Sequence, residues 1–200
     1  MVAKTSTMLP LGTPCPGFAL PEPMTGKIIA LQDFADKPFL IVAFLCNHCP
    51  YVKHIIKPFV ALMQHDQHKG LAVVAINSND ITAYPEDSPE HMAALATSLG
   101  FTFPYLFDET QSTAKAFQAI CTPEFYLFDQ RRNLYYRGRF DGSTPKNNAP
   151  VTGQDLKAAL DALLRGKLPP KQQHSSIGCN IKWRPGNEPD YFLTAEAKNK

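Results

Sequence analysis

Two apolar runs on either side of a segment with helical periodicity constrain the fold most. Residues 38–45 and 71–76 are almost continuously apolar, as expected for strands of a sheet that is covered on both faces. Between them, at about 49–68, apolar side chains recur at spacings of three and four residues, which predicts an amphipathic helix. These side chains are Val52, Ile55, Ile56, Phe59, Val60 and Met63. Strand, helix and strand in this order predict a parallel, right-handed β-α-β unit.

Downstream of this unit, the pattern predicts a helical insert, an antiparallel strand pair and a last helix. The helix of the insert is expected at 89–99, with Ser88 as its N-cap, and the two strands at 125–128 and 133–137. The last helix is expected to run to about Leu164, with Thr152 or Gly153 as its cap. This order of elements predicts the α/β class, with a mixed central sheet flanked by helices on both faces.

The domain organisation follows from the same pass along the chain. We predict a single domain over 1–200, with a core at about 10–165. A Pro- and Gly-rich stretch forms an extended N-terminal extension. The tail at 166–200 has little periodicity, but it carries apolar side chains such as Ile181 and Trp183. Since such side chains gain about 1.5–3 kcal/mol each on full burial, we expect the tail to pack on the domain.

Composition excludes several classes of partner. The chain is 44% hydrophobic with a net charge of +2 and no basic or acidic block, so we expect no nucleic-acid partner. No stretch approaches the roughly 20 apolar residues of a membrane span, and the N-terminus lacks a secretory h-region. We therefore expect a cytoplasmic protein with no membrane partner. Five cysteines in a reducing compartment suggest redox or metal chemistry rather than structural disulfides.

The candidate catalytic site is Cys46-Asn-His-Cys49, at the junction between the first buried strand and the helix. A helix N-terminus favours a thiolate, and the thiolate is the reactive form of cysteine. The second sulfur can then close a disulfide. Asn47, His48 and Pro50 are predicted to tune the thiolate, since a partial positive charge on His48 favours it and Pro50 suits the first helical turn.

Other roles for the cysteine pair are weaker. A zinc site needs a second ligand pair, and Cys121 and Cys179 lie 58 residues apart. Covalent haem attachment requires a histidine where this chain has Pro50. Two inert buried cysteines remain an alternative. The β-α-β context favours the redox interpretation, and we expect no metal or other cofactor.

A second element, Cys121-Thr122-Pro123-Glu124, opens a later strand. Together with the Cys-x-x-Cys motif after the first core strand, it resembles thioredoxin-like proteins over roughly residues 10–165. The resemblance implies a thioredoxin-like fold and a cis peptide bond before Pro123. It also implies that the Thr122 backbone offers a platform on which a substrate chain pairs as an extra strand.

Within that superfamily, the chain is most similar to a peroxiredoxin-like group, the AhpC/TSA group, that carries a Cys-x-x-Cys motif. The resemblance aligns Cys49 with the peroxidatic cysteine of that group. In the usual P-x-x-x-T-x-x-C motif, Cys46 then replaces the threonine and Val42 the proline. The hydroxyl that orients peroxide is therefore missing, and Arg137 or Arg139 is a candidate for the distant arginine.

Three further residues are possible accessory groups. Glu124 could accept a proton from the second cysteine, or could be a solvated charge at the strand end. Cys121 should lie near the motif if the fold is right. Cys179 could be a resolving thiol, or a buried inert cysteine. Cys15, in the Pro-rich extension, is interpreted as structural or incidental.

Three functions are compatible with these residues. The leading hypothesis is a thiol–disulfide oxidoreductase in which Cys46 attacks and Cys49 resolves, acting on a disulfide-containing protein or a small-molecule thiol or disulfide. The second is an antioxidant peroxidase that reduces a hydroperoxide with Cys49. The third is a non-catalytic binding protein whose thiols sense the redox state.

Overall fold

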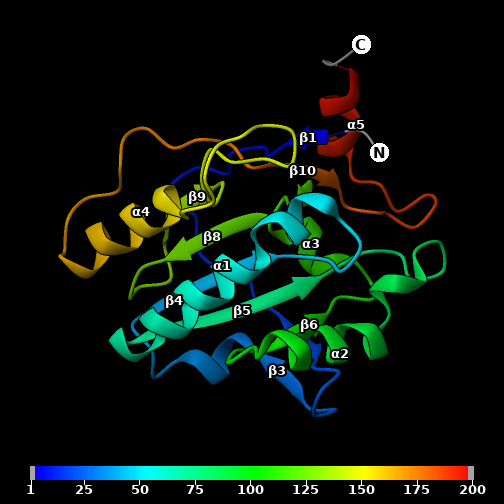
Figure 1. Cartoon of the computed structure of the whole chain (residues 1–200), viewed down its shortest axis with the longest axis horizontal. Helices are drawn as coiled ribbons and strands as arrows, with labels where there is room; N and C mark the ends of the chain where they lie inside the picture. Colours follow the sequence, from blue (N-terminus) through cyan, green and yellow to red (C-terminus); the bar gives the residue numbers. More distant parts are fainter. Residues whose placement is uncertain (1–2, 198–200) are drawn as a thin grey trace.

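The computed structural model describes residues 3–197, and its centre is a five-stranded mixed sheet (Figure 1). The strands are β4 (Phe39–Phe44), β5 (Leu71–Asn77), β6 (Tyr105–Phe107), β8 (Glu124–Phe128) and β9 (Leu134–Gly138). They lie in the order β6-β5-β4-β8-β9. β4, β5 and β6 are parallel, whereas β8 is antiparallel to both β4 and β9. The predicted mixed sheet and the predicted antiparallel pair are confirmed.

Helix α1 (Pro50–Asp66) connects β4 to β5 and completes the predicted β-α-β unit. It begins directly after Cys49, with Pro50 at its first position, where a missing N–H group is no loss. Its seven buried residues include the six that carry the predicted periodicity. A short 3₁₀ turn, Gln67–Lys69, follows it, and Gly70 adopts a left-handed φ of 82° before the chain enters β5.

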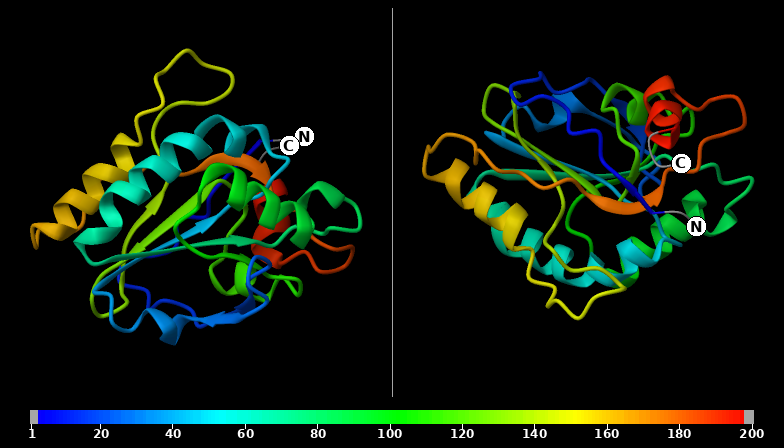
Figure 2. Two further views of the ribbon diagram at one scale, coloured as in Figure 1. Left: turned by 60° about the horizontal axis from the view of Figure 1, so that its bottom comes forward. Right: turned by 90° about the horizontal axis from the view of Figure 1, so that it is seen from above.

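The two faces of the sheet carry separate apolar clusters. α1, α2 (Pro89–Leu99) and α4 (Gln154–Leu164) pack against one face, through residues such as Phe59, Met92 and Leu160. α3 (Ser112–Ala116) lies against the other face together with N-terminal and C-terminal segments (Figure 2). Those segments include the hairpin of β2 (Ala19–Pro21) and β3 (Ile28–Ala30), and α5 (Asp190–Ala197). Two further 3₁₀ turns are Leu31–Phe34 and Pro85–Asp87.

The predicted caps of two helices can be compared with the structure. Ser88 caps α2, and its Oγ accepts a hydrogen bond from the His91 backbone N–H at 3.5 Å, as expected. Gly153, in a left-handed conformation, occupies the N-cap of α4.

The C-terminal tail forms a second sheet that the sequence pattern did not reveal. β10 (Ile177–Asn180) lies between β1 (Ala3–Thr5) and β7 (Cys121–Thr122), antiparallel to both. Farther along the tail, the side chains of Trp183 and Phe192 are buried in the core. The tail therefore packs on the domain, as its apolar residues predicted, but as a strand and a helix. Among the described helices, none is long and apolar enough to cross a membrane.

Candidate functional site

The two cysteines of the motif lie at the carboxyl end of β4, where the chain turns into α1. Cys49 is the N-cap residue of the helix, and Cys46 lies in the preceding turn. Only 1% of Cys46 and 0% of Cys49 is exposed, and both are free thiols. The Cys46 sulfur lies 3.1 Å from Thr122 Oγ1, and the Cys49 sulfur lies 3.3 Å from Thr122 O. The structure thus brings both thiols to Thr122, the residue whose backbone the resemblance implies as a substrate platform.

Thiolate stabilisation differs between the two sulfurs. Hydrogen bonds from the Cys179 and Cys46 side chains hold the pKa of Cys49 well below its usual range, and the backbone N–H groups of Val52 and Cys179 add to this effect. Burial raises the pKa of Cys46, and its hydrogen bond with Cys49 raises it further. Cys49 is also the N-cap residue of α1, where the positive end of the helix dipole favours a negative charge.

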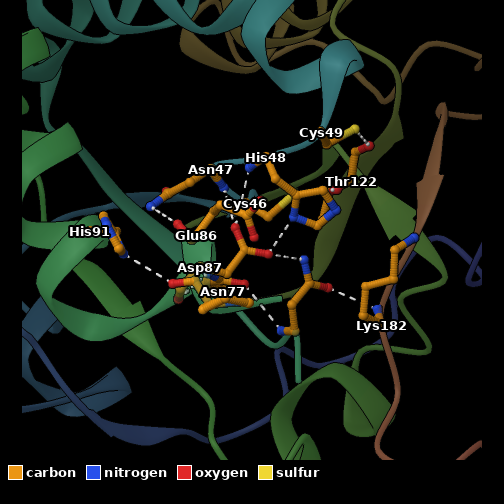
Figure 3. Close-up of polar contacts among 12 residues, drawn as sticks. Cys46, Asn47, His48, Cys49, Asn77, Glu86, Asp87, His91, Thr122 and Lys182 are labelled. Atoms are coloured by element: carbon orange, nitrogen blue, oxygen red, sulfur yellow. Dashed lines mark hydrogen bonds and ion pairs between the residues drawn. The ribbon is translucent and has the colours of Figure 1, made fainter. Parts of the chain in front are cut away.

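His48 is held by a buried carboxylate that the sequence analysis did not identify. Its Nδ1 lies 2.6 Å from Asp87 Oδ2, and Figure 3 shows the two side chains facing each other. Tyr84 stacks on the imidazole ring with ring centroids 4.8 Å apart. The Nε2 atom of His48 is buried without a hydrogen-bond partner. This arrangement fixes the ring and leaves one nitrogen available for proton transfer.

Asp87 anchors the turn that carries the motif. Its Oδ1 accepts the backbone N–H groups of Asn47 at 2.7 Å and His48 at 3.3 Å, and Asn79 Nδ2 donates to Oδ2 at 2.7 Å. Burial alone would raise the pKa of Asp87, but the hydrogen bonds from His48, Asn79 and Asn47 outweigh it, so that the net pKa is lowered. Asp87 is therefore a carboxylate at neutral pH and orients His48.

The side chain of Asn47 points away from the sulfurs and holds the turn in place. Its Nδ2 donates to Glu86 O at 2.9 Å, and its Oδ1 accepts from the Tyr105 hydroxyl at 3.1 Å. With Pro50 at the first position of α1, these contacts fix the geometry of the motif. The structure supports a positioning role for Asn47 rather than direct contact with a thiolate.

The peptide bond between Thr122 and Pro123 is cis, as the resemblance implies. The backbone edge of Thr122, however, is already paired. β10 occupies it, with Cys179 opposite Thr122 and Asn180 opposite Cys121. The protein's own tail therefore occupies the platform that was predicted for a substrate strand. The sequence pattern did not indicate a strand in this part of the tail.

Glu124 and Cys121 lie together, and Cys121 belongs to a different apolar cluster from Cys46 and Cys49, although it is near enough to Cys49 for a charge there to raise its pKa. Glu124 Oε2 accepts the backbone N–H of Ile120 at 3.0 Å and lies 3.8 Å from Cys121 Sγ, while its Oε1 accepts the Tyr126 hydroxyl at 2.8 Å. Glu124 is 1% exposed, so the interpretation as a solvated charge is wrong. Burial raises its pKa to about 7 and raises the pKa of Cys121 well above the usual range.

Several other candidates lie outside the site. Arg137 donates to Met8 O and to Gln173 Oε1, and Arg139 pairs with Asp155 at 2.6 Å, so other partners hold both guanidinium groups. Cys15 is half-buried in the N-terminal extension, and burial raises its pKa to about 12. This buried environment supports the interpretation of Cys15 as a structural residue.

One set of atoms could hold a cation. Ligand atoms of Cys46, His48 and Asp87 lie within 4.8 Å of one another. In the structure these groups hydrogen-bond instead, His48 to Asp87 and Cys46 to Thr122. The sequence analysis predicted no metal, and the three side chains fit proton transfer beside a thiol equally well.

Asp87 was missed because it lies 38 residues beyond Cys49 in a polar stretch without a motif. One signal was present. The stretch follows β5, which is parallel to β4, and the carboxyl ends of parallel strands meet at the same edge of a sheet. Polar residues just after Asn77 were therefore candidates for contact with the Cys-x-x-Cys turn.

Comparisons with known proteins place this geometry in a family. A family model described as the AhpC/TSA family matches residues 11–137, which is more than half of the chain. The chain belongs to the AhpC/TSA family. This family membership and its thioredoxin-like fold confirm the predicted resemblance. Among curated proteins, none matches the chain.

Solved structures agree with this assignment. The chain is similar to an uncharacterized conserved protein from Geobacillus kaustophilus, with 50% identity, a TM-score of 0.91, and coverage of 93% of this chain and 98% of that one. A thiol:disulfide interchange protein of the thioredoxin family from Chlorobium tepidum is 17% identical, with a TM-score of 0.59 and coverage of 78% and 99%. Peroxidoxin BcpB from Mycobacterium tuberculosis is 17% identical, with a TM-score of 0.58 and coverage of 78% and 96%. The last two show the fold alone.

Proposed function

We propose that the protein is a thiol–disulfide oxidoreductase that cycles Cys46 and Cys49 between dithiol and disulfide. One observation carries the proposal. Cys49 is the N-cap residue of α1, and the Cys46 and Cys49 sulfurs lie 3.1 Å and 3.3 Å from two atoms of the same residue, Thr122, in one buried site. A stabilised thiolate beside a second thiol is the minimum requirement for disulfide exchange.

The electrostatics favour the reverse of the order of attack predicted from the sequence. The neighbouring Cys179 and Cys46 side chains lower the pKa of Cys49, whereas burial raises the pKa of Cys46. We therefore assign Cys49 as the nucleophile. Its thiolate attacks a substrate disulfide, forms a mixed disulfide and releases one thiolate. Cys46 then attacks the Cys49 sulfur, which yields the Cys46–Cys49 disulfide and releases the second thiol.

His48 and Asp87 supply the proton transfer in this scheme. Cys46 must lose a proton before it attacks, and its sulfur lies within 4.8 Å of a His48 ring nitrogen. The Asp87 carboxylate stabilises the imidazolium that forms when His48 accepts that proton. His48 can then protonate the departing thiolate, so that one group serves both half-steps.

The burial of both sulfurs bears on the substrate. With 1% or less of either cysteine exposed, a small-molecule disulfide reaches the site more readily than a folded protein does. A disulfide in a folded protein can reach the two sulfurs only if the segments that cover the motif move. The cytoplasmic location predicted from the sequence remains part of this proposal.

A peroxidase is the second candidate, and the position of Cys49 favours it. In the resemblance to the AhpC/TSA group, Cys49 aligns with the peroxidatic cysteine, and here Cys49 is the N-cap residue of α1 and its pKa is lowered by the neighbouring Cys179 and Cys46 side chains. Against it, Cys46 stands where the group has threonine, and Arg137 and Arg139 are engaged elsewhere.

The experiment that separates the two compares rates on one sample. The reduced protein is mixed with hydrogen peroxide or with bis(2-hydroxyethyl) disulfide, and thiol loss is followed by quenched alkylation. Fast exchange with the disulfide, beside a peroxide rate typical of a free thiol of the same pKa, supports the oxidoreductase. A peroxide rate far above that value would favour the peroxidase. Slow reaction with both, together with release of a bound partner on oxidation, would favour the redox sensor.

A further inference from the structure

The strand that covers Thr122 carries a cysteine of its own. β10 pairs with β7 in antiparallel register, and this register sets Cys179 directly opposite Thr122. Thr122 O is also the group that lies 3.3 Å from Cys49 Sγ. The tail therefore brings a third sulfur to the backbone position that holds the motif cysteines.

The third sulfur belongs to the same buried site as Cys49. Thr122, which lies opposite Cys179 in the sheet, contacts both motif sulfurs, and the Cys179 side chain helps to lower the pKa of Cys49. Cys179 is 2% exposed and belongs to the same apolar cluster as Cys46 and Cys49. A disulfide between Cys49 and Cys179 requires the two sulfurs to approach to about 2.05 Å, and their shared burial beside Thr122 favours that approach.

The backbone of β10 is built for close approach to this position. A Cβ atom added at Gly178 would lie 2.0 Å from Thr122 O and 2.7 Å from Thr122 C. No side chain fits there, so glycine lets the strand lie against the Thr122 peptide. The N–H group of Ile181 extends the pairing with a 2.8 Å hydrogen bond to Ile120 O. The tail is thus held in register on both sides of Cys179.

From this geometry we propose that Cys179 is a third redox-active thiol, delivered to Cys49 on an internal strand that takes the place of a substrate strand. The inference rests on the proposed function, because it requires Cys49 to form mixed disulfides. Once a substrate disulfide has reacted with Cys49, Cys179 attacks the Cys49 sulfur, displaces the second substrate thiol and leaves a Cys49–Cys179 disulfide. Its thiol proton goes to the departing thiolate.

Exchange within the site then returns the tail thiol. The Cys46 thiolate attacks Cys49 in the Cys49–Cys179 disulfide, which forms the Cys46–Cys49 disulfide and regenerates the Cys179 thiol once its sulfur takes up a proton. One disulfide bond is broken and one is formed at this step, so no further oxidant is needed. Cys49 is the shared sulfur, and the two other cysteines are alternative resolving thiols.

The test uses the full chain and bis(2-hydroxyethyl) disulfide as the probe. Wild type, Cys46→Ser, Cys46→Ser/Cys179→Ser and the control Cys46→Ser/Cys15→Ser are each reacted, and the released mercaptoethanol is counted per protein. We expect two equivalents from wild type, from Cys46→Ser and from the control, and one from Cys46→Ser/Cys179→Ser. That double variant should retain one mercaptoethanol on Cys49.

Tryptic mapping locates the new bond. Because Lys37 precedes a proline, Cys46 and Cys49 share the peptide 28–53, whereas Cys179 lies in 172–182 and Cys121 in 116–131. In the oxidised Cys46→Ser variant, we expect a disulfide that joins peptide 28–53 to peptide 172–182. After reduction, the two peptides should be recovered separately. The same cross-link should persist in the Cys15 control.

Each contrary outcome has a distinct meaning. If Cys46→Ser releases one equivalent and keeps its adduct, or joins 28–53 to 116–131, the role of Cys179 is refuted while the dithiol function stands. If Cys46→Ser releases none but wild type releases two, Cys46 is the nucleophile, and the inference fails with the assigned order. If wild type itself releases none, the proposed function fails.

Discussion

The substitution Glu124→Gln tests whether the buried carboxyl group of Glu124 makes the free energy of unfolding depend on pH near neutrality. The pKa of Glu124 is raised from 4.5 to about 7 by burial. Between these values the folded state holds a proton that the unfolded state has lost, so the free energy of unfolding falls as pH rises. At about 1.4 kcal/mol per pKa unit, the full difference is about 3 kcal/mol.

The substitution suits the local hydrogen bonds. The amide oxygen of glutamine can accept the backbone N–H groups of Ile120 and Cys121, as Oε2 of Glu124 does. The new NH₂ group can donate to the Tyr126 hydroxyl oxygen, while that hydroxyl donates to Phe117 O at 3.1 Å. We therefore expect the variant to fold, and its side chain at this position does not titrate.

Urea unfolding at intervals from pH 4.5 to pH 8 measures the effect. The free energy of wild type minus that of Glu124→Gln should fall by about 3 kcal/mol across this window, which corresponds to roughly 6–12 °C in melting temperature for a chain of this size. Glu109→Gln, at a side chain that is 65% exposed, is the control and should leave the pH dependence unchanged. A difference that stays constant from pH 4.5 to pH 8 would refute the reasoning.

Three further sets of substitutions test the site and the core. Asp87→Asn and His48→Asn should each slow disulfide exchange by roughly 10²-fold. The double variant should be no slower than either single variant, because the two residues act as one unit. Additive losses in the measured rate constants would contradict the pairing. Gly178→Ala should move β10 off Thr122 and speed alkylation of Cys49, whereas Gly17→Ala, whose added Cβ meets nothing within 4 Å, should not; equal alkylation rates would contradict this role. Phe59→Ala should lower the free energy of unfolding by about 3–5 kcal/mol in urea titrations, because Phe59 is fully buried among Phe103, Phe125 and Phe140; a loss under 1 kcal/mol would contradict its place in the core.

Local patterns were sufficient for the central fold because its elements are strongly periodic. The runs that became β4 and β5 and the amphipathic α1 are each determined by neighbours within a few residues. The position of Cys49 at the start of α1 followed from the same pattern. Such local signals also sufficed for the caps at Ser88 and Gly153.

Contacts between distant segments could not be predicted in this way. Asp87 reaches His48 through a turn whose path depends on the packing of α2, and nothing in its own neighbourhood indicates a partner. β10 has only four residues and no alternating pattern, so that its strand conformation comes from β1 and β7. The occupied edge of Thr122 was therefore outside the reach of sequence periodicity.

The alternation of side chains along a strand decides which of the remaining cysteines can react with Cys49. Neighbouring residues in β7 point to opposite faces, so Cys121 and Thr122 cannot both face the motif. Thr122 contacts Cys46, and Cys121 accordingly lies in the other apolar cluster, beside Glu124. Cys179 is opposite Thr122 and shares the cluster of Cys46 and Cys49. Of the two cysteines beside the Thr122 peptide, we therefore expect Cys179 rather than Cys121 to exchange with Cys49.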